Sequence, residues 1–403
     1  MRSASIAAAL ALAPWALCAQ QQPLSNQLST HAPAYRDELL GLHKSLVSIE
    51  SITGNENEVG NFLVDYLAER GYTVDLQFVA PSHGTPEGRP RFNVLAWHGG
   101  PRANPRVVVS SHIDVVPPYI PYGIDHGKVS KDTMIKGRGS VDAKGAVATM
   151  IVALDQLLAA GEVSGEDVML LFVVGEEATG DGMRAFSDSL NGMDPPRRFE
   201  AVIFGEPTEN KLACGHKGGL FCEVTARGVP GHSGYPWLGK SANELMVRAM
   251  ARIIDTDLGS SPLFGNTTVN IGRFDGGVAA NVIPERAFVE LAARVAIGPE
   301  AEGGKVVQRK MQAIFDAIDH EAFTFYCSHG YGFVETNCDV PGFETVVVNY
   351  GTDVPILKGD HTRYLYGPGN ILVAHGAREN LTVGDLETAV EGYQKLILHA
   401  LKQ

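Results

Sequence analysis

Four short apolar runs in this chain are each followed by residues that can bind a metal ion. The runs cover residues 107–109, 168–174, 201–204 and 371–374, and the residues that follow them include His112, Asp114, Glu176, Glu177, Glu206 and His375. Runs rich in Val, Ile and Leu predict buried parallel strands. Ligands of open α/β sheets bind beyond the carboxyl ends of the strands. We therefore expect these side chains to meet at one sheet edge and form a metal centre.

The segments between the runs predict an α/β domain. Apolar spacing and helix-end signals predict helices over 35–48, 55–69 and 142–160, and alternation predicts strands over 72–79 and 91–97. The strand–helix–strand order that ends at residue 174 is typical of a mainly parallel sheet.

The pattern changes near Lys217 and predicts a second domain. Strands are expected over 220–226, 267–274 and 287–295, and helices over 241–254 and 304–318. These two strand–helix–strand blocks predict an inserted α+β domain. We expect a catalytic domain in two parts, over 20–214 and 326–403, with the insertion over 215–325.

Charge and the first residues indicate the compartment. With 46 acidic against 33 basic side chains, the net charge of −13 argues against nucleic acid or an anionic membrane as a partner. A basic start, an apolar stretch over 6–18 and small residues near 16–19 predict a signal peptide over 1–19. This stretch is too short to span a bilayer. We expect a secreted protein.

Four cysteines remain beyond the signal peptide: Cys214, Cys222, Cys327 and Cys338. An even number in an exported chain permits disulfides. Of the three connectivities, the local pairs Cys214–Cys222 and Cys327–Cys338 are the simplest, and free buried thiols are the alternative. Two glycosylation sequons begin at Asn266 and Asn380.

The candidate ligands have defined chemical roles. His112 could bind metal while Asp114, two residues on, accepts a hydrogen bond from the second ring nitrogen. Asp142 stands at the start of a predicted helix, where it could also serve as a cap. The adjacent charges of Glu176 and Glu177 repel each other unless a cation or a shared proton compensates.

Together these motifs resemble the M20 family of metallopeptidases and amidohydrolases, in matching order over almost the whole mature chain. The motifs are His112-x-Asp114, Gly139–Asp142, Gly175–Glu177, Gly205–Thr208 and the late His375. The family includes acetylornithine deacetylase, succinyl-diaminopimelate desuccinylase, aminoacylases and glutamate carboxypeptidase. The segments 231–234 and 281–284 resemble motifs of its inserted lid or dimerisation domain. The leader and the run 350–355 look most like secreted fungal carboxypeptidases of this family.

The resemblance implies a ligand set for two zinc ions. Asp142 would bridge the ions, one of which would add His112 and Glu206 and the other Glu177 and His375. Imidazole and carboxylate ligands suit zinc, although such a site also accepts Co²⁺ or Mn²⁺.

The resemblance also implies catalytic and substrate-binding residues. Glu176 would act as general base and acid, with Asp114 supporting the site. His232 would stabilise the oxyanion, reaching over from the lid domain or from a partner subunit. Arg294 and Asn281 would bind the substrate's carboxylate or carbonyl, because a guanidinium fork matches a carboxylate.

We therefore expect a two-zinc hydrolase that cuts an amide bond next to a free carboxylate. Short peptides with an exposed C-terminus are the expected substrates. A deacylase of N-acyl amino acids is the first alternative, and a non-catalytic binding protein is the second. The inserted domain makes a homodimer possible.

Overall fold

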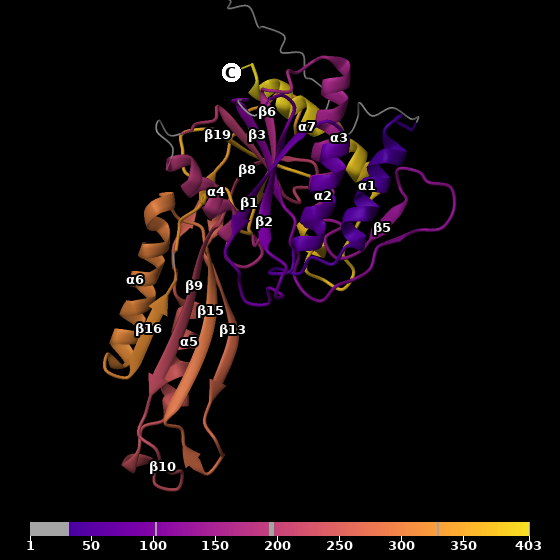
Figure 1. Cartoon of the computed structure of the whole chain (residues 1–403). Helices are drawn as coiled ribbons and strands as arrows, with labels where there is room; N and C mark the ends of the chain where they lie inside the picture. Colours follow the sequence, from indigo (N-terminus) through magenta and orange to yellow (C-terminus); the bar gives the residue numbers. More distant parts are fainter. Residues whose placement is uncertain (1–31, 101–102, 193–196, 329, 403) are drawn as a thin grey trace, which may run out of the picture.

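The computed structural model describes residues 32–100, 103–192, 197–328 and 330–402, so the predicted signal peptide lies outside the described residues. Figure 1 shows an α/β domain and, below it, an elongated inserted domain. The predicted fold, a mainly parallel α/β domain with an inserted α+β domain, is confirmed. In the described part of the chain, no helix combines the length and apolar character needed to cross a bilayer.

A six-stranded sheet forms the centre of the α/β domain. In spatial order its strands are β1 (Thr73–Val79), β2 (Arg91–Trp97), β6 (Val168–Val173), β3 (Val107–His112), β7 (Ala201–Gly205) and β19 (Thr362–Tyr366). The last four run parallel to one another, and β1 and β2 form an antiparallel edge. The strands β3, β6 and β7 are buried throughout, as their apolar sequences predict.

Both faces of this sheet are covered. One core lies beneath the helices α1 (Arg36–Ser48), α2 (Asn57–Glu69), α3 (Lys144–Ala160) and α7 (Val383–Ala400). The other core lies beneath α4 (Asp181–Asn191) and a small sheet of β17 (Val334–Glu335), β8 (Leu212–His216) and β18 (Thr345–Val348). Along β3, Val107 and Val109 face the first core and Val108 the second. A third sheet joins β20 (Asn380–Thr382), β5 (Met134–Lys136) and β4 (Gly123–Ile124).

The inserted domain is an antiparallel sheet with two helices on one face. Its strands, in spatial order, are β13 (Thr268–Gly276), β15 (Arg286–Val295), β9 (Gly218–Arg227) and β16 (Phe323–Cys327). The helices α5 (Ala242–Asp255) and α6 (Glu300–Asp319) complete a β-α-β-β-α-β order and pack on a separate apolar core. The distal end carries β10 (Gly231–His232), which pairs with β14 (Val282–Ile283).

The prediction of a buried strand over 371–374 is wrong. Residues Ile371–Val373 form a short 3₁₀ helix, η3, in which Leu372 is 85% exposed. The Asn370 side chain accepts a hydrogen bond from the backbone N–H of Leu372, a local contact that favours a turn. The fourth parallel strand is instead β19, for which the sequence pattern gave no prediction.

The simplest disulfide pairing is also wrong. The bonds join Cys214 to Cys338 and Cys222 to Cys327. Cys222 and Cys327 are directly opposite each other in the β9–β16 register. Cys214 lies on β8 in the α/β domain, so the nearby Cys222 belongs to a different sheet. Pairing the cysteines by their proximity in the sequence gave the wrong result because the chain passes from the α/β domain into the inserted domain between Cys214 and Cys222.

Candidate metal centre

The carboxyl ends of three parallel strands bring most of the predicted ligands together. His112 ends β3, Glu176 and Glu177 follow β6, and Glu206 follows β7. Ligand atoms of His112, Glu176 and Glu206 lie within 4.8 Å of one another, as do those of His112, Asp142 and Glu177. The structure thus places five of the predicted residues in one cluster.

His375 completes the cluster from outside the sheet. It follows η3 in a backbone turn with φ of 61°, and its side chain is 53% exposed. Its Nε2 lies 2.9 Å from Glu177 Oε2 and 3.3 Å from Asp142 Oδ2. The residue is therefore delivered to the predicted place, but by a turn rather than by a strand end.

Asp114 orients the His112 ring through its backbone carbonyl rather than, as the sequence predicted, through its carboxylate. The Nδ1 atom of His112 lies 3.0 Å from the backbone carbonyl of Asp114 and 3.6 Å from its carboxylate. The carboxylate accepts hydrogen bonds from the backbone N–H groups of Glu176 (3.1 Å) and Glu177 (3.2 Å) and from the Thr53 hydroxyl (2.8 Å). Asp114 thus orients the turn that carries both glutamates, and its carbonyl orients the His112 ring.

Asp142 is held by two residues that the sequence did not single out. Helix α3 begins at Lys144, so Asp142 does not cap it, and the Asp142–Ala143 peptide bond is cis. The carboxylate of Glu379 accepts hydrogen bonds from the backbone N–H groups of Val141 (3.0 Å) and Asp142 (3.2 Å). Arg138 pairs with the other Glu379 oxygen at 2.6 Å, and both side chains are buried. Nothing local in the sequence indicates this contact, which joins residues more than 230 positions apart.

The crowded carboxylates of the centre need a bound cation or protons to balance their charge. Burial raises the pKa of Glu206 well above its ordinary value, and the Asp142 and Glu177 carboxylates add to this rise although His112 opposes it. Burial also raises the pKa of Glu176, with Glu206 as the next cause. Hydrogen bonds to Asp142 and Glu177 raise the pKa of His375 to about 10. Two imidazoles and several crowded carboxylates are a donor set that fits zinc.

A further buried carboxylate, that of Asp353, borders the centre. A cavity of about 10 Å³ beside His112 and Glu206 is also lined by Thr352 and Asp353. Among the described residues, none donates a hydrogen bond to Asp353 Oδ2. Burial is the main cause that raises the pKa of Asp353, to about 7, while His112 opposes it. The run 350–355 carried a family resemblance in the sequence, but the pattern assigned Asp353 no role.

His232 and Asn281 lie together, away from the metal centre. The β10–β14 pairing places them side by side, and the backbone N–H of Ser233 donates to the carbonyl of Asn281 at 3.1 Å. Both residues are exposed. Figure 1 shows β10 at the end of the inserted domain that is remote from the α/β domain.

Arg294 lies at the opposite end of the inserted sheet, next to the α/β domain. A Cβ atom placed on Gly351 would lie 3.5 Å from Arg294 Nη1 and 2.6 Å from the Tyr331 hydroxyl. Burial and then Glu176 raise the pKa of Tyr331, and Arg294 lowers it, so these groups lie within electrostatic reach of one another. Within the described ranges, no carboxylate forms an ion pair with Arg294. Its guanidinium is thus free for a ligand near the centre.

The two sequon asparagines differ in exposure. Asn266 is exposed in the short strand β12 (Gly265–Asn266). Asn380 is half-buried in β20, and Thr382 of the same sequon is engaged in the capping box of α7.

Comparisons with known proteins agree with this architecture. The profile of the peptidase dimerisation domain of the M20 type matches residues 214–323, and that of peptidase family M28 matches residues 93–203. A peptidase M20 domain-containing protein of Sordaria macrospora is 53% identical over 97% of this chain and 90% of its own length. A protein of Aspergillus oryzae named as a probable carboxypeptidase is 47% identical over 90% of this chain and 88% of its own. A Staphylococcus aureus tripeptidase structure covers 91% of this chain and 99% of its own, with a TM-score of 0.73 and 20% identity.

The fold and the site define a two-domain enzyme architecture in which an α/β domain carries a candidate metal centre and an insertion carries a dimerisation domain. At 53% identity over nearly its full length, the chain belongs to the peptidase M20 family.

Proposed function

We propose that this protein is a secreted carboxypeptidase that holds two zinc ions and removes C-terminal residues from short peptides. One observation carries the proposal: the five predicted ligands converge on one cluster, with Glu176 inside it and an unpaired Arg294 at its border. The name of the Aspergillus oryzae relative, a probable carboxypeptidase, supports the peptide substrate.

The orientation of Asp142 supports its role as the bridging ligand. Its Oδ1 faces His112 Nε2 at 3.1 Å and its Oδ2 faces His375 Nε2 at 3.3 Å. Each carboxylate oxygen therefore faces a different imidazole, as two neighbouring metal ions require. Glu206 lies on the His112 side, with its Oε1 3.9 Å from His112 Nε2. Glu177 lies on the His375 side, with its Oε2 2.9 Å from His375 Nε2. Zinc bound there would polarise the scissile carbonyl and activate water near neutral pH, and Co²⁺ or Mn²⁺ could replace it.

Glu176 is the proposed general base and acid. Its raised pKa brings its carboxylate closer to the working pH of a proton-transfer group. It takes a proton from the attacking water and then donates it to the amine that leaves. The hydrogen bond from its backbone N–H to Asp114 holds the side chain at the centre.

Arg294 is the proposed anchor for the free carboxylate of the substrate. Its guanidinium lies beside Gly351 without a carboxylate partner among the described residues. A bidentate pair with a C-terminal carboxylate would fix the last peptide bond relative to Glu176.

We propose that the enzyme acts as a homodimer in which each copy completes the other's site. His232 and Asn281 lie at the distal tip, remote from the metal centre of their own chain. The match to a peptidase dimerisation domain supports a second copy as the source of these residues. His232 would then stabilise the oxyanion and Asn281 would bind the carbonyl or carboxylate.

Two disulfides and a leader sequence support secretion. Disulfides persist in oxidising compartments, and Cys214–Cys338 and Cys222–Cys327 tie down the insertion. The exposed Asn266 is the better placed of the two proposed glycosylation sites. The separate core of the insertion supports an inserted domain close to the proposed 215–325, between catalytic parts over 20–214 and 326–403, although β16 extends the inserted sheet to Cys327.

The test combines metal analysis of the purified protein with a substrate panel. We expect two zinc ions per chain and release of C-terminal residues from dipeptides and tripeptides. Turnover of N-acetyl amino acids with no turnover of peptides would instead establish a deacylase. Turnover of neither class by the zinc-loaded protein would refute a hydrolytic function.

A further inference from the structure

The helix-free face of the inserted sheet is open where it adjoins the α/β domain. Leu220 and Ala293 point into the core beneath α5 and α6. Because side chains alternate along a strand, Gly219 and Phe221 of β9 and Ala292 and Arg294 of β15 lie on the opposite face. Gly219 stands directly opposite Arg294, and Phe221 opposite Ala292. The unpaired guanidinium therefore shares a surface with an aromatic ring.

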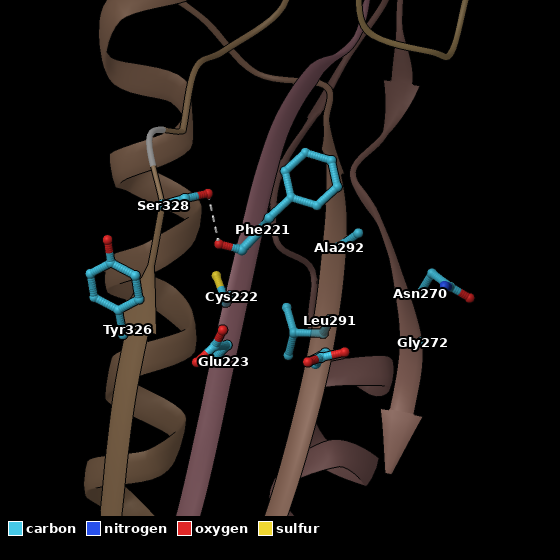
Figure 2. A pocket seen from close by; sticks show the side chains of 10 residues that line it. Phe221, Cys222, Glu223, Asn270, Gly272, Leu291, Ala292, Tyr326 and Ser328 are labelled. Atoms are coloured by element: carbon cyan, nitrogen blue, oxygen red, sulfur yellow. Dashed lines mark hydrogen bonds between the residues drawn. The ribbon is translucent and has the colours of Figure 1, made fainter. Parts of the chain in front are cut away.

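A hollow of about 390 Å³ begins at this ring. It is lined by Phe221, Glu223, Asn270, Glu290, Ala292 and Tyr326, among others (Figure 2). Phe221 is 53% exposed although its neighbour Leu220 is fully buried. An exposed ring that borders both a hollow and a candidate carboxylate anchor offers an apolar surface to a bound ligand.

Two aromatic rings flank the position opposite Arg294. A Cβ atom on Gly219 would lie 3.5 Å from Cε1 of Tyr331 and 3.6 Å from Cε2 of Phe221. These are ordinary contact distances, so the backbone does not require a glycine here. The backbone N–H of Tyr331 donates to the carbonyl of Gly219 at 3.0 Å, which holds the Tyr331 segment beside the strand. A single methyl group at Gly219 would already contact both rings, so Phe221 and Tyr331 border the same side of the strand next to Arg294.

We propose that Phe221 and Tyr331 bind the side chain of the substrate's C-terminal residue and make the enzyme prefer aromatic and large aliphatic residues there. The proposal rests on the proposed function, in which Arg294 binds the carboxylate of that same residue. A side chain on the same carbon as that carboxylate must lie within a few ångströms of Arg294.

The dimensions and charges agree with this occupant. Alternate residues on one face of a strand are about 6.6 Å apart, so the hollow at Phe221 and Ala292 begins one side-chain length from Arg294. Further along the same face, Glu223 lies directly opposite Glu290. Like charges repel an acidic side chain that enters the hollow. The site thus selects against C-terminal Asp and Glu.

The experiment measures kcat/KM for peptides that differ only in a C-terminal Phe, Leu, Ala or Glu. For the zinc-loaded wild type we expect Phe and Leu to exceed Ala by about 10- to 100-fold, the range for apolar pockets, and Glu to be the poorest. Phe221→Ala should lower the Phe-to-Ala ratio about 10-fold and leave the Ala substrate within about twofold. Gly219→Val, whose side chain would displace the Phe221 and Tyr331 rings, should lower the same ratio. Phe274→Ala removes an exposed ring that does not line the hollow and should leave the ratio unchanged.

Three outcomes would overturn the proposal. In the first, Phe221→Ala leaves the ratio unchanged, and in the second it lowers turnover of all four substrates equally. In the third, it converts a dimer into a monomer in sedimentation experiments, which would assign this face to a second copy. If the wild type hydrolyses only N-acyl amino acids, the proposed carboxypeptidase function fails. The same ratio, measured on N-acetyl-Phe and N-acetyl-Ala, then still tests the hollow.

Discussion

The metal centre and the tip of the inserted domain hold their functional candidates in opposite ways. At the centre, Asp142 contacts both His112 and His375, while Glu379 and Asp114 fix the backbone around it. At the tip, His232 and Asn281 are exposed, and the side chain of His232 contacts Gly234 and Tyr235 of its own loop. A single chain can therefore assemble the proposed ligand set by itself. The same chain cannot bring the proposed oxyanion group, His232, to the metal centre without a second copy or a large domain movement.

The strongest test of the centre is Glu176→Gln. The substitution keeps the shape of the side chain and removes its proton-transfer capacity. We expect kcat to fall by about 10³- to 10⁴-fold, while zinc content and melting temperature stay near those of the wild type. Unchanged turnover of the best peptide would show that Glu176 is not the general base.

The tip is tested by His232→Ala. Loss of an oxyanion donor should lower kcat and kcat/KM equally, by about 10²- to 10³-fold. Because His232 is exposed and remote from the cores, its removal should leave the fold intact.

Mixing the two inactive variants decides which copy supplies His232. If the tip acts on the partner, a randomly assorted mixture of Glu176→Gln and His232→Ala subunits should regain about a quarter of wild-type activity, since half the dimers contain one intact site of two. Refolding or subunit exchange, followed by a turnover assay, measures this. Absence of any recovery in verified mixed dimers would assign His232 to its own chain's lid closure.

Removal of metal should affect the two regions unequally. Chelation is expected to lower the melting temperature by several degrees, because bound metal stabilises the native state by about 4 kcal/mol at 1,000 times its Kd. Hydrogen exchange should increase around Asp142 and Glu177 and stay constant in β13 and β15. Equal increases in both regions would show that the centre and the insertion unfold together.

The smallest effect we expect is that metal removal changes the slope of stability against pH. In the metal-free protein burial raises the pKa of Asp353 to about 7, and those of Glu176 and Glu206 are raised as well. Each of these three groups then binds more protons in the folded state than in the unfolded state, so its contribution to stability falls as pH rises from about 4 to about 7, by at most ~1.4 kcal/mol per pH unit. Burial lowers the pKa values of His43, His216 and His361 to about 4, so these residues contribute in the opposite direction with and without metal. Zinc binds deprotonated ligands, so the stabilisation that bound zinc gives to the folded state rises with pH. The change in melting temperature between pH 5 and 7.5 should therefore be more positive with zinc than with chelator.

The sequence predicted those parts of the centre that depend on local pattern. The apolar runs before His112, Glu176 and Glu206 are strands, and they end where a sheet-edge site requires. The strand predicted before His375 is wrong, because four apolar residues beside Asn370 can form a turn as readily as a strand.

Residues that act through distant contacts had no sequence signal. Glu379 supports Asp142 across more than 230 positions, and Asp353 is buried beside the centre by the fold. The Cys222–Cys327 bond follows from the register of β9 and β16, and the separation of His232 from the metal centre follows from the position of β10 at the distal end; the sequence alone specifies neither.

The disulfide between Cys214 and Cys338 has a consequence for how the protein responds to proteolytic cleavage. The bond spans 124 positions and closes a covalent ring around the inserted domain, with Cys222–Cys327 as a second ring inside it. A protease that cuts an exposed tip loop, such as the one around Trp237, would therefore nick the molecule without releasing a fragment. Nicked molecules should run as one band on a non-reducing gel and as two after reduction, and the Cys222–Cys327 bond would still join β9 to β16.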